Sequence, residues 1–299
     1  MKNVLNILTK SKKENNKKRR STIEEDRKHI LTSKSGFFMR EAYKTLRTNV
    51  NFALADAEGS KVILVTSAMQ SEGKSLTALN LAISLAQTEA KVLLIDCDLR
   101  RPKLSRLMGV SSNVGLSNLL MDPQKLNGIV LKHERLGISV ILAGDIPPNP
   151  SELLASVRMQ NLITALRSKY DYRIIDTPPV DMVIDSVVLA PMCDGVLFVV
   201  KAEQSERGAV IHAMEQLEYA KAKVIGFVFN GMNSESGSGY GKYRYKKYGR
   251  YGYGKYGYGK YGYGRYGYRS GYGYGYGYQS HKSAAPEQQT PPPAADQQA

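Results

Sequence analysis

Six apolar runs divide the middle of the chain, and the stretches between several of them have helical spacing. The runs are seven to nine residues long and lack the apolar–polar alternation of strands with one face in water. Such runs are typical of strands buried on both faces, which occur in parallel sheets covered by helices. The six predicted strands are residues 61–68, 91–98, 138–144, 172–179, 194–202 and 223–230.

Helical periodicity is clearest before the first of these strands. There, apolar residues recur at every fourth position, at Ala42, Leu46, Val50 and Leu54, and form one stripe of a helix. Helices are predicted over residues 41–54, 73–88, 151–170 (as one or two helices) and 205–220. The alternation of strands and helices predicts an α/β fold, a mostly parallel sheet with helices on both faces. Ligands in such folds bind beyond the carboxyl ends of the strands.

The net charge of +15 is concentrated at the two ends of the chain. Residues 1–30 hold ten Lys and Arg against four Asp and Glu, and residues 236–299 hold ten against two. The intervening residues are nearly balanced, which excludes a uniformly basic packaging protein. No apolar stretch approaches the ~18 residues of a membrane-spanning helix, and no signal-peptide segment is present. We therefore expect the chain to remain in the cytosol.

Composition predicts three regions: a basic leader (1–35), a globular domain (36–233) and a tail (234–299). Residues 240–278 contain 16 of the 20 tyrosines, interleaved with glycine and basic residues and almost without aliphatic side chains. Such a segment cannot bury a core, so we expect it to be disordered.

The strongest local motif is TSAMQSEGKS (66–75), which lies between a predicted strand and a predicted helix. This is the context of a phosphate-binding P-loop, in which backbone N–H groups and a helix N-terminus hold phosphates. Lys74 would reach the β- and γ-phosphates, and Ser75 would bind Mg²⁺. Ala68 replaces the first glycine of the usual motif. Alone, the Gly73-Lys74-Ser75 tripeptide fits an ordinary strand–turn–helix corner equally well.

Carboxylates at two other strand ends favour the nucleotide site. Asp96 and Asp98 follow the second predicted strand, and Asp176 ends the fourth in a Walker B arrangement. Each could be a solvated turn acid, but together with the loop they indicate a P-loop NTPase that binds Mg²⁺. The four histidines lack metal-binding spacing and no GxSxG motif is present, which disfavours zinc and serine-hydrolase chemistry.

These motifs resemble those of the bacterial tyrosine kinases of capsule and exopolysaccharide export, in their stand-alone cytoplasmic form. The resemblance covers roughly residues 36–233, and the tyrosine-rich tail is similar in character. Besides the P-loop, the matching stretches are REAYKTLRTN (40–49), IDCDLRRP (95–102), GDIPPNPSELL (144–154), DTPPVDMVIDS (176–186) and the strand ending in Asn230.

The resemblance implies a role for each matched residue. Asp96 would be the base, or the orienting group, for the attacking tyrosine hydroxyl, and Arg100 and Arg101 would contact phosphate or a neighbouring subunit. The implied catalytic residues are Lys74, Asp96 and Asp98. The implied nucleotide-binding residues are Gln70, Ser71, Glu72, Gly73, Lys74, Ser75 and Asn230. The implied Mg²⁺ ligands are Ser75, Asp98 and Asp176.

Two positions depart from the family's pattern. The subunit-contact motif reads Glu41, Lys44 and Arg47, with lysine at the middle position, where an arginine fork could bind a carboxylate at two points. Ring assembly is therefore expected to be weaker. Ser71 stands where a glycine is common, so it must adopt a tight loop conformation.

The resemblance implies an ATP-dependent protein tyrosine kinase that phosphorylates its own tail and regulates capsule or exopolysaccharide synthesis and export. It also implies a transmembrane polysaccharide co-polymerase activator, a homo-oligomeric ring before phosphorylation, a cognate tyrosine phosphatase and no specific nucleic acid. The implied location is the cytoplasm, with recruitment to the inner face of the membrane. The implied acceptors are Tyr240, Tyr243, Tyr245, Tyr248, Tyr251, Tyr253, Tyr256, Tyr258, Tyr261, Tyr263, Tyr266, Tyr268, Tyr272, Tyr274, Tyr276 and Tyr278.

The alternative hypothesis is a partitioning-type P-loop ATPase switch whose tail binds nucleic acid or forms condensates. Basic aromatic segments suit polyanions through charge and stacking. Against it, Met69 occupies the position of the signature lysine of those ATPases. A scaffold with an inactive nucleotide site is a third hypothesis, disfavoured because all three carboxylates are present.

Overall fold

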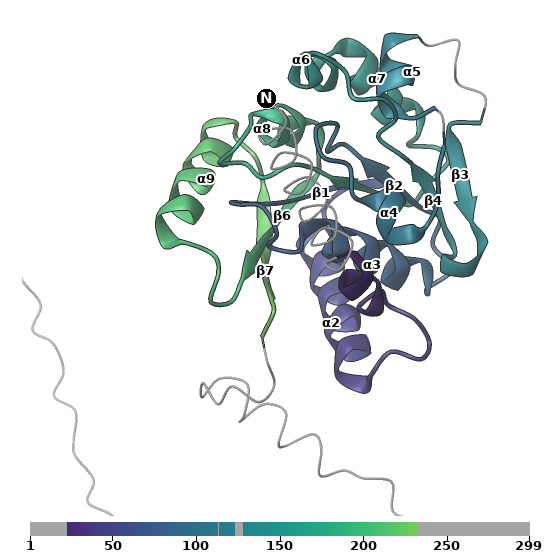
Figure 1. Cartoon of the computed structure of the whole chain (residues 1–299), viewed down its shortest axis with the longest axis vertical. Helices are drawn as coiled ribbons and strands as arrows, with labels where there is room; N and C mark the ends of the chain where they lie inside the picture. The colour runs from purple at the N-terminus through teal and green to yellow at the C-terminus, as the bar shows by residue number, and fades with distance from the viewer. Residues whose placement is uncertain (1–22, 113, 123–127, 233–299) are drawn as a thin grey trace, which may run out of the picture. The chain divides into compact units, whose positions relative to one another are not determined.

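The computed structural model describes residues 23–112, 114–122 and 128–232 (Figure 1). The predicted tail, its tyrosines and most of the predicted leader lie outside these residues. The described residues form a seven-stranded sheet in the order β3-β4-β2-β5-β1-β6-β7, in which only the β3–β4 pair is antiparallel. Its strands are β1 (Lys61–Ser67), β2 (Val92–Asp96), β3 (Val130–His133), β4 (Ile138–Ile141), β5 (Tyr172–Asp176), β6 (Gly195–Lys201) and β7 (Val224–Asn230). All six predicted strands are confirmed, and β3 is an addition.

Helices follow most of the strands, as the spacing predicts. The α-helices are α2 (Phe37–Ala53), α3 (Lys74–Ala86), α4 (Leu104–Met108), α5 (Leu116–Met121), α6 (Pro150–Ala155), α7 (Val157–Ala165), α8 (Asp185–Leu189) and α9 (Arg207–Tyr219). Two 3₁₀ turns occupy Glu134–Leu136 and Ala190–Met192. The predicted helix over 151–170 is two helices, because Ser156 ends α6 and its hydroxyl accepts a hydrogen bond from the Met159 amide (3.3 Å), which caps α7.

The central strands β1, β2, β5 and β6 are buried on both faces, which explains why they are continuously apolar. Along β1, Val62 and Leu64 belong to a core shared with α5 to α9, while Ile63 and Val65 belong to a core shared with α2, α3 and α4. Figure 1 shows these two helical layers on either side of the sheet. The predicted fold class, a P-loop-type α/β sheet with helices on both faces, is confirmed.

The packed part of the chain begins upstream of residue 36. Residues 23–28 are helical, and the Leu31 side chain is only 1% exposed. The Leu31 amide donates to Asn80 Oδ1 (2.8 Å), and Asn80 Nδ2 donates to the His29 carbonyl (2.9 Å). Residues 29–31 therefore pack against α3 as part of the body, although the prediction assigned them to the leader.

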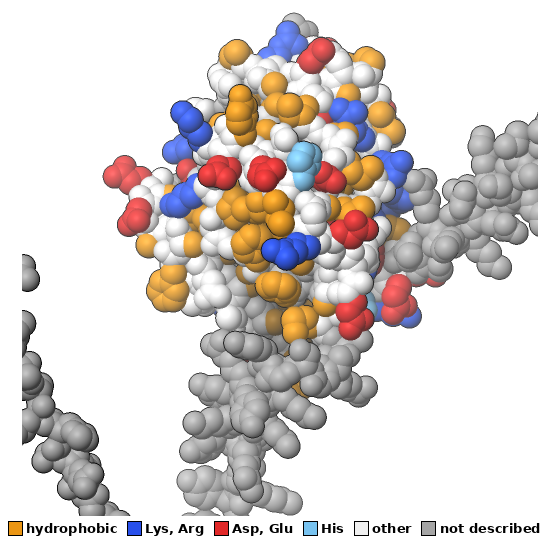
Figure 2. Space-filling view, turned by 90° about the vertical axis from the view of Figure 1, so that its left-hand side faces the viewer, with side chains coloured by type: hydrophobic (Ala, Val, Ile, Leu, Met, Phe, Trp, Pro, Cys, Tyr) orange, Lys and Arg blue, Asp and Glu red, His pale blue; other side chains and the backbone are white. Residues whose placement is uncertain are grey.

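Strand β7 forms one edge of the sheet and carries exposed aromatic side chains. Phe227 and Phe229 are 47% and 66% exposed. Figure 2 shows apolar and charged side chains intermingled on this side of the molecule, over α9 and β7. Within the described residues, no helix is both long and apolar enough to span a membrane.

Candidate nucleotide-binding and phosphoryl-transfer site

Two neighbouring strands bring the predicted carboxylates together. Asp96 ends β2, Asp176 ends β5, and the two residues are in register in the β2–β5 ladder, where neighbouring strands lie about 4.8 Å apart. Lys74, the first residue of α3, donates from Nζ to Asp98 Oδ2 at 3.3 Å. Asp96 and Asp176 are fully buried, and Asp98 is 5% exposed. The Lys74 side chain is only 11% exposed, although it belongs to the first turn of α3.

Burial controls the electrostatics of this cluster. It raises the pKa of Asp96 well above the ordinary range, and the charges of Asp176 and Asp98 raise it further. Burial also raises the pKa of Asp176 to about 6, while the Lys74 ammonium opposes this. Burial would lower the pKa of Lys74, but the neighbouring carboxylates more than offset it, so this pKa lies above its ordinary value. Lys74 therefore stays protonated, while Asp96 and Asp176 resist ionisation.

Ser75 and Asp176 have the properties of Mg²⁺ ligands. Ser75 Oγ and both Asp176 carboxylate oxygens are buried without a hydrogen-bond partner among the described residues. Buried oxygens without partners are costly, and a hard cation would satisfy them. The described residues contain no cluster of three or more His, Cys, Asp or Glu arranged to hold a metal. Mg²⁺ is commonly held by one or two protein oxygens together with phosphates and water.

The loop before α3 has the backbone conformation of an anion-binding nest. Ser71 and Gly73 have positive φ angles of 66° and 95°, as the tight loop predicted at Ser71 requires. The φ of Gly73 is one that other residues rarely adopt, and a Cβ atom there would lie 1.9 Å from Asn230 Nδ2, so glycine is strongly favoured at this position. The amides of residues 70–73 donate to no group in the described part of the chain. Successive free amides beside a helix N-terminus are suited to phosphate oxygens.

Three residues predicted to contact the nucleotide have side chains that make hydrogen bonds within the protein instead. The Glu72 carboxylate is 1% exposed and accepts hydrogen bonds from the Met69 amide (2.8 Å) and the Ser205 hydroxyl. Asn230 Nδ2 donates to the Glu72 carbonyl (2.9 Å). Gln70 Oε1 accepts from Arg101 (2.8 Å). Side-chain contact of Gln70, Glu72 and Asn230 with a nucleotide thus remains a prediction, and the bonds observed here hold the loop.

Arg100 is also engaged within the chain. Its guanidinium donates twice to Asp185, at 2.9 and 3.1 Å, and Asp185 is fully buried. The same arginine donates to the Ser151 hydroxyl (2.8 Å). This bidentate pair joins the loop after β2 to α8 and α6, and the sequence motifs gave no indication of it.

The three predicted subunit-contact residues lie on α2 and differ in how firmly they are held. Glu41 and Lys44 form an exposed ion pair at 2.7 Å within the helix. Arg47 donates to the Ser84 carbonyl of α3. Glu41 and Lys44 are therefore accessible to another molecule, whereas Arg47 also fastens α2 to α3.

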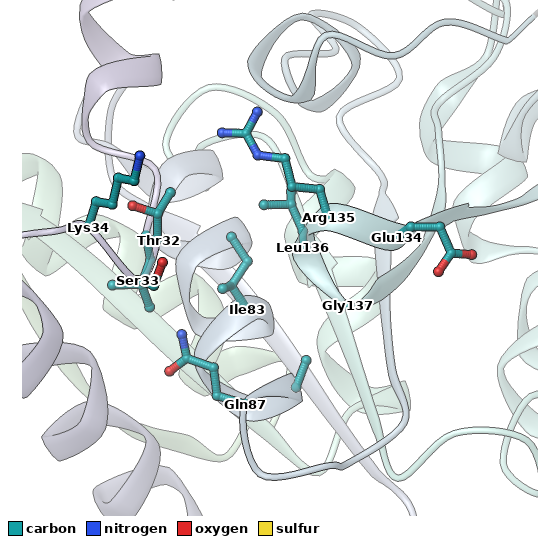
Figure 3. Close-up of a pocket in the computed structure, with 11 residues that line it drawn as sticks. Thr32, Ser33, Lys34, Ile83, Gln87, Glu134, Arg135, Leu136 and Gly137 are labelled. Atoms are coloured by element: carbon teal, nitrogen blue, oxygen red, sulfur yellow. The ribbon is translucent and has the colours of Figure 1, made fainter.

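A cavity of about 590 Å³ lies at the C-terminal end of α3. Its lining includes Leu31, Ile83, Gln87, Arg135 and Leu136, from the segment before α2, the end of α3 and the β3–β4 turn (Figure 3). The strand-end carboxylates line no part of it. We assign the nucleotide site to the strand ends because the ionisable groups, free amides and unpartnered oxygens gather there.

Comparisons with known proteins agree with this architecture. Residues 60–224 match a family model described as an AAA domain. The chain is 38% identical over 206 residues to a tyrosine-protein kinase, YwqD, of Bacillus subtilis (strain 168), covering 69% of this chain and 86% of that one. It is 36% identical over 204 residues to a tyrosine-protein kinase, CpsD, of Streptococcus agalactiae, covering 68% and 87%. Among solved structures, the kinase domain of the Escherichia coli tyrosine kinase ETK matches with a TM-score of 0.64 and 35% identity, over 68% of this chain and 79% of that one.

Proposed function

Because the chain belongs to the bacterial tyrosine-protein kinases, we propose that it transfers the γ-phosphoryl group of ATP to tyrosines of its own tail, residues 240–278. The tail offers sixteen acceptors. The observation that carries this proposal is the buried cluster of one lysine and three carboxylates at adjoining strand ends, next to a loop with free amides. The cluster and the loop supply what phosphoryl transfer requires, which is positioning and charge stabilisation.

Each residue of the cluster has a proposed task. The amides of residues 70–73 bind phosphate oxygens, and the Lys74 ammonium neutralises charge on the β- and γ-phosphates. Ser75, Asp176 and Asp98 would hold Mg²⁺, which offsets the negative charge that develops on the transferred group. Exclusion of water from this buried site strengthens all of these interactions.

Asp96 is the proposed proton acceptor or orienting group for the tyrosine hydroxyl. A tyrosine has an unperturbed pKa of about 10, and an ordinary carboxylate is a weak base toward it. Burial raises the pKa of Asp96, so its ionised form is a stronger base than an ordinary carboxylate. Its oxygens are held in place by the Asp98 amide (3.2 Å) and the Leu104 amide (3.3 Å).

The competing function is an ATPase switch of the partitioning type, favoured only by the basic, aromatic composition of the tail. The two functions differ in where the phosphate goes. A kinase leaves it on tyrosine, whereas a switch releases it to water. Incubation of the purified chain with Mg²⁺ and ATP, followed by measurement of phosphotyrosine and free phosphate, tests the proposal. Phosphate release without phosphotyrosine would contradict it.

The cellular role follows from the resemblance. We place the kinase in capsule or exopolysaccharide synthesis and export, as a ring that contacts a transmembrane activator and is reset by a tyrosine phosphatase. Lys12, Lys13 and Lys17 are among the basic residues of the leader that would attract an anionic membrane surface, at about 1 kcal/mol per residue. We therefore expect weak activity from the chain alone, rising when the activator's cytoplasmic segment is added.

A further inference from the structure

The P-loop is held by side-chain hydrogen bonds, most of them from residues that lie far away in the sequence. Four consecutive carbonyls of the loop each accept a hydrogen bond from a side chain. Ser67 Oγ donates to Met69 O (2.8 Å), Gln204 Nε2 to Gln70 O (3.3 Å), Lys201 Nζ to Ser71 O (3.2 Å) and Asn230 Nδ2 to Glu72 O (2.9 Å). Three of these four donors come from the end of β6, the turn that follows it, and the end of β7.

A fourth side chain from the same region, that of Ser205, holds the loop by a hydrogen bond to the buried carboxyl group of Glu72. The Ser205 hydroxyl donates to Glu72 Oε1 and also accepts from the Lys201 amide (2.8 Å). Glu72 in turn accepts from the Met69 amide. Because Glu72 is 1% exposed, its carboxyl oxygens depend on these bonds in place of water. Lys201, Gln204, Ser205 and Asn230 are called the outer brace below.

Peptide geometry connects the outer brace to phosphate binding. In a planar trans peptide, the carbonyl of one residue and the amide of the next point in opposite directions, and the described chain contains no cis peptide. The carbonyls of residues 69–72 point toward the side chains that donate to them. The amides of residues 70–73 therefore point in the opposite direction, toward the proposed phosphate site. Those are the amides without a partner in the described part of the chain.

We infer that Ser205 and Asn230 are positioning residues for phosphate binding, acting through Glu72, and that Asn230 works on the loop rather than on the nucleotide base. Gln204 and Lys201 contribute less, because their bonds are exposed and longer. Asn230 also packs directly over Gly73. This inference rests on the proposed ATP site and adds to it the residues that keep its amides oriented.

The test separates phosphate recognition from base recognition. The affinities of the full chain for Mg·ATP, Mg·GTP and Mg·tripolyphosphate are measured by calorimetry. The variants are Ser205→Ala, Ser205→Thr, Asn230→Ala and, as a control, Asn161→Ala, which removes an exposed amide from α7. Loss of one bond to the loop corresponds to about a threefold to tenfold change. We expect Ser205→Ala and Asn230→Ala to weaken all three ligands by the same factor, while Ser205→Thr and Asn161→Ala bind as the wild type does.

Several results would overturn the inference. If Asn230→Ala weakens ATP but leaves GTP and tripolyphosphate unchanged, then Asn230 contacts the base. Unchanged affinities in both alanine variants would show that the loop keeps its shape without the brace, while leaving the proposed kinase standing. A wild type that binds none of the ligands would contradict the ATP site itself. Gln204→Ala, an exposed change that cannot disturb the core, is the second variant. If the Ser205 and Asn230 variants misfold, Gln204→Ala decides the question. A small and equal loss of its affinity for all three ligands supports the inference, and wild-type affinity contradicts it.

Discussion

At the scale of single residues, Asp176, a proposed Mg²⁺ ligand, is a buried carboxylate whose ionisation lowers the stability of the metal-free protein. Its pKa is raised to about 6, mainly by burial, from an ordinary value of 3.8. The folded state therefore holds this proton more tightly than the unfolded state. The associated stability is fully present below pH 3.8 and is lost as the pH rises through about 6. At neutral pH the ionised group opposes folding until a cation binds.

Asp176→Asn should therefore stabilise the metal-free protein at pH 7 by about 1–3 kcal/mol. Below pH 4 the wild type and the variant should be equally stable, because Asp176 is then protonated in both states. The measurement is urea unfolding in EDTA at pH 4, 5.5 and 7. A variant less stable than the wild type at pH 7 would show that the Asp176 charge is stabilised by Lys74 more than it is destabilised by burial.

Asp96→Asn should separate catalysis from binding. The substitution keeps the acceptor oxygen for one backbone amide but removes the base. We expect the rate of phosphorylation to fall about 10²- to 10⁴-fold, while the affinity for Mg·ATP stays within about threefold. Initial rates and calorimetry measure the two effects. Equal losses in rate and affinity would reassign Asp96 to holding Mg²⁺.

At the scale of elements, six of the seven strands could be predicted because each is a continuous apolar run. The shortest strand and the shortest helices could not be predicted. The helices α4, α5 and α8 contain five or six residues, too few for helical periodicity to show, and β3 has only four, of which none is fully buried. The strand-end carboxylates were predictable because the carboxyl ends of parallel strands meet at one edge. The Ser205–Glu72 bond was not, since 133 residues separate its partners and no motif links them.

The segment before α2 provides a test at this scale. Leu31 is buried among α3 and its neighbours, although the predicted leader extended to residue 35. We expect Leu31→Ala to destabilise the protein by about 2–4 kcal/mol, from lost burial and the cavity left behind. Ile146→Ala, at a side chain that is 68% exposed, is the control and should change stability by less than about 0.5 kcal/mol. Equal, small effects in denaturant unfolding would mean that residues 29–31 do not contribute to the core.

At the scale of the whole molecule, we propose that phosphorylation of the tail controls assembly through charge. Residues 236–299 carry ten basic and two acidic residues, and each phosphotyrosine adds a charge of about −1.5 to −2. A highly phosphorylated tail would become strongly negative and would be repelled from neighbouring sites that hold nucleotide phosphates. The exposed Glu41–Lys44 pair of α2 is the proposed contact between subunits.

Phosphorylation should therefore dissociate the proposed ring. Light scattering before and after incubation with Mg·ATP should show a fall in mass toward that of one chain. In unphosphorylated protein, Lys44→Arg should strengthen the ring, since arginine restores the planar fork. An unchanged mass after confirmed tail phosphorylation would refute dissociation and leave the kinase assignment intact.

The most direct measurement of the central claim is a map of phosphotyrosines in the wild type, Lys74→Met and Lys132→Met after incubation with Mg·ATP. Lys74 is the buried cation of the site, whereas Lys132 is an exposed lysine of β3. Circular dichroism should verify that Lys74→Met folds, because the change leaves three buried carboxylates without their cation. The account predicts phosphate on tyrosines of residues 240–278 in the wild type and in Lys132→Met, and none in Lys74→Met. Equal labelling of the folded Lys74→Met protein, or ATP hydrolysis by the wild type with an unlabelled tail, would contradict it.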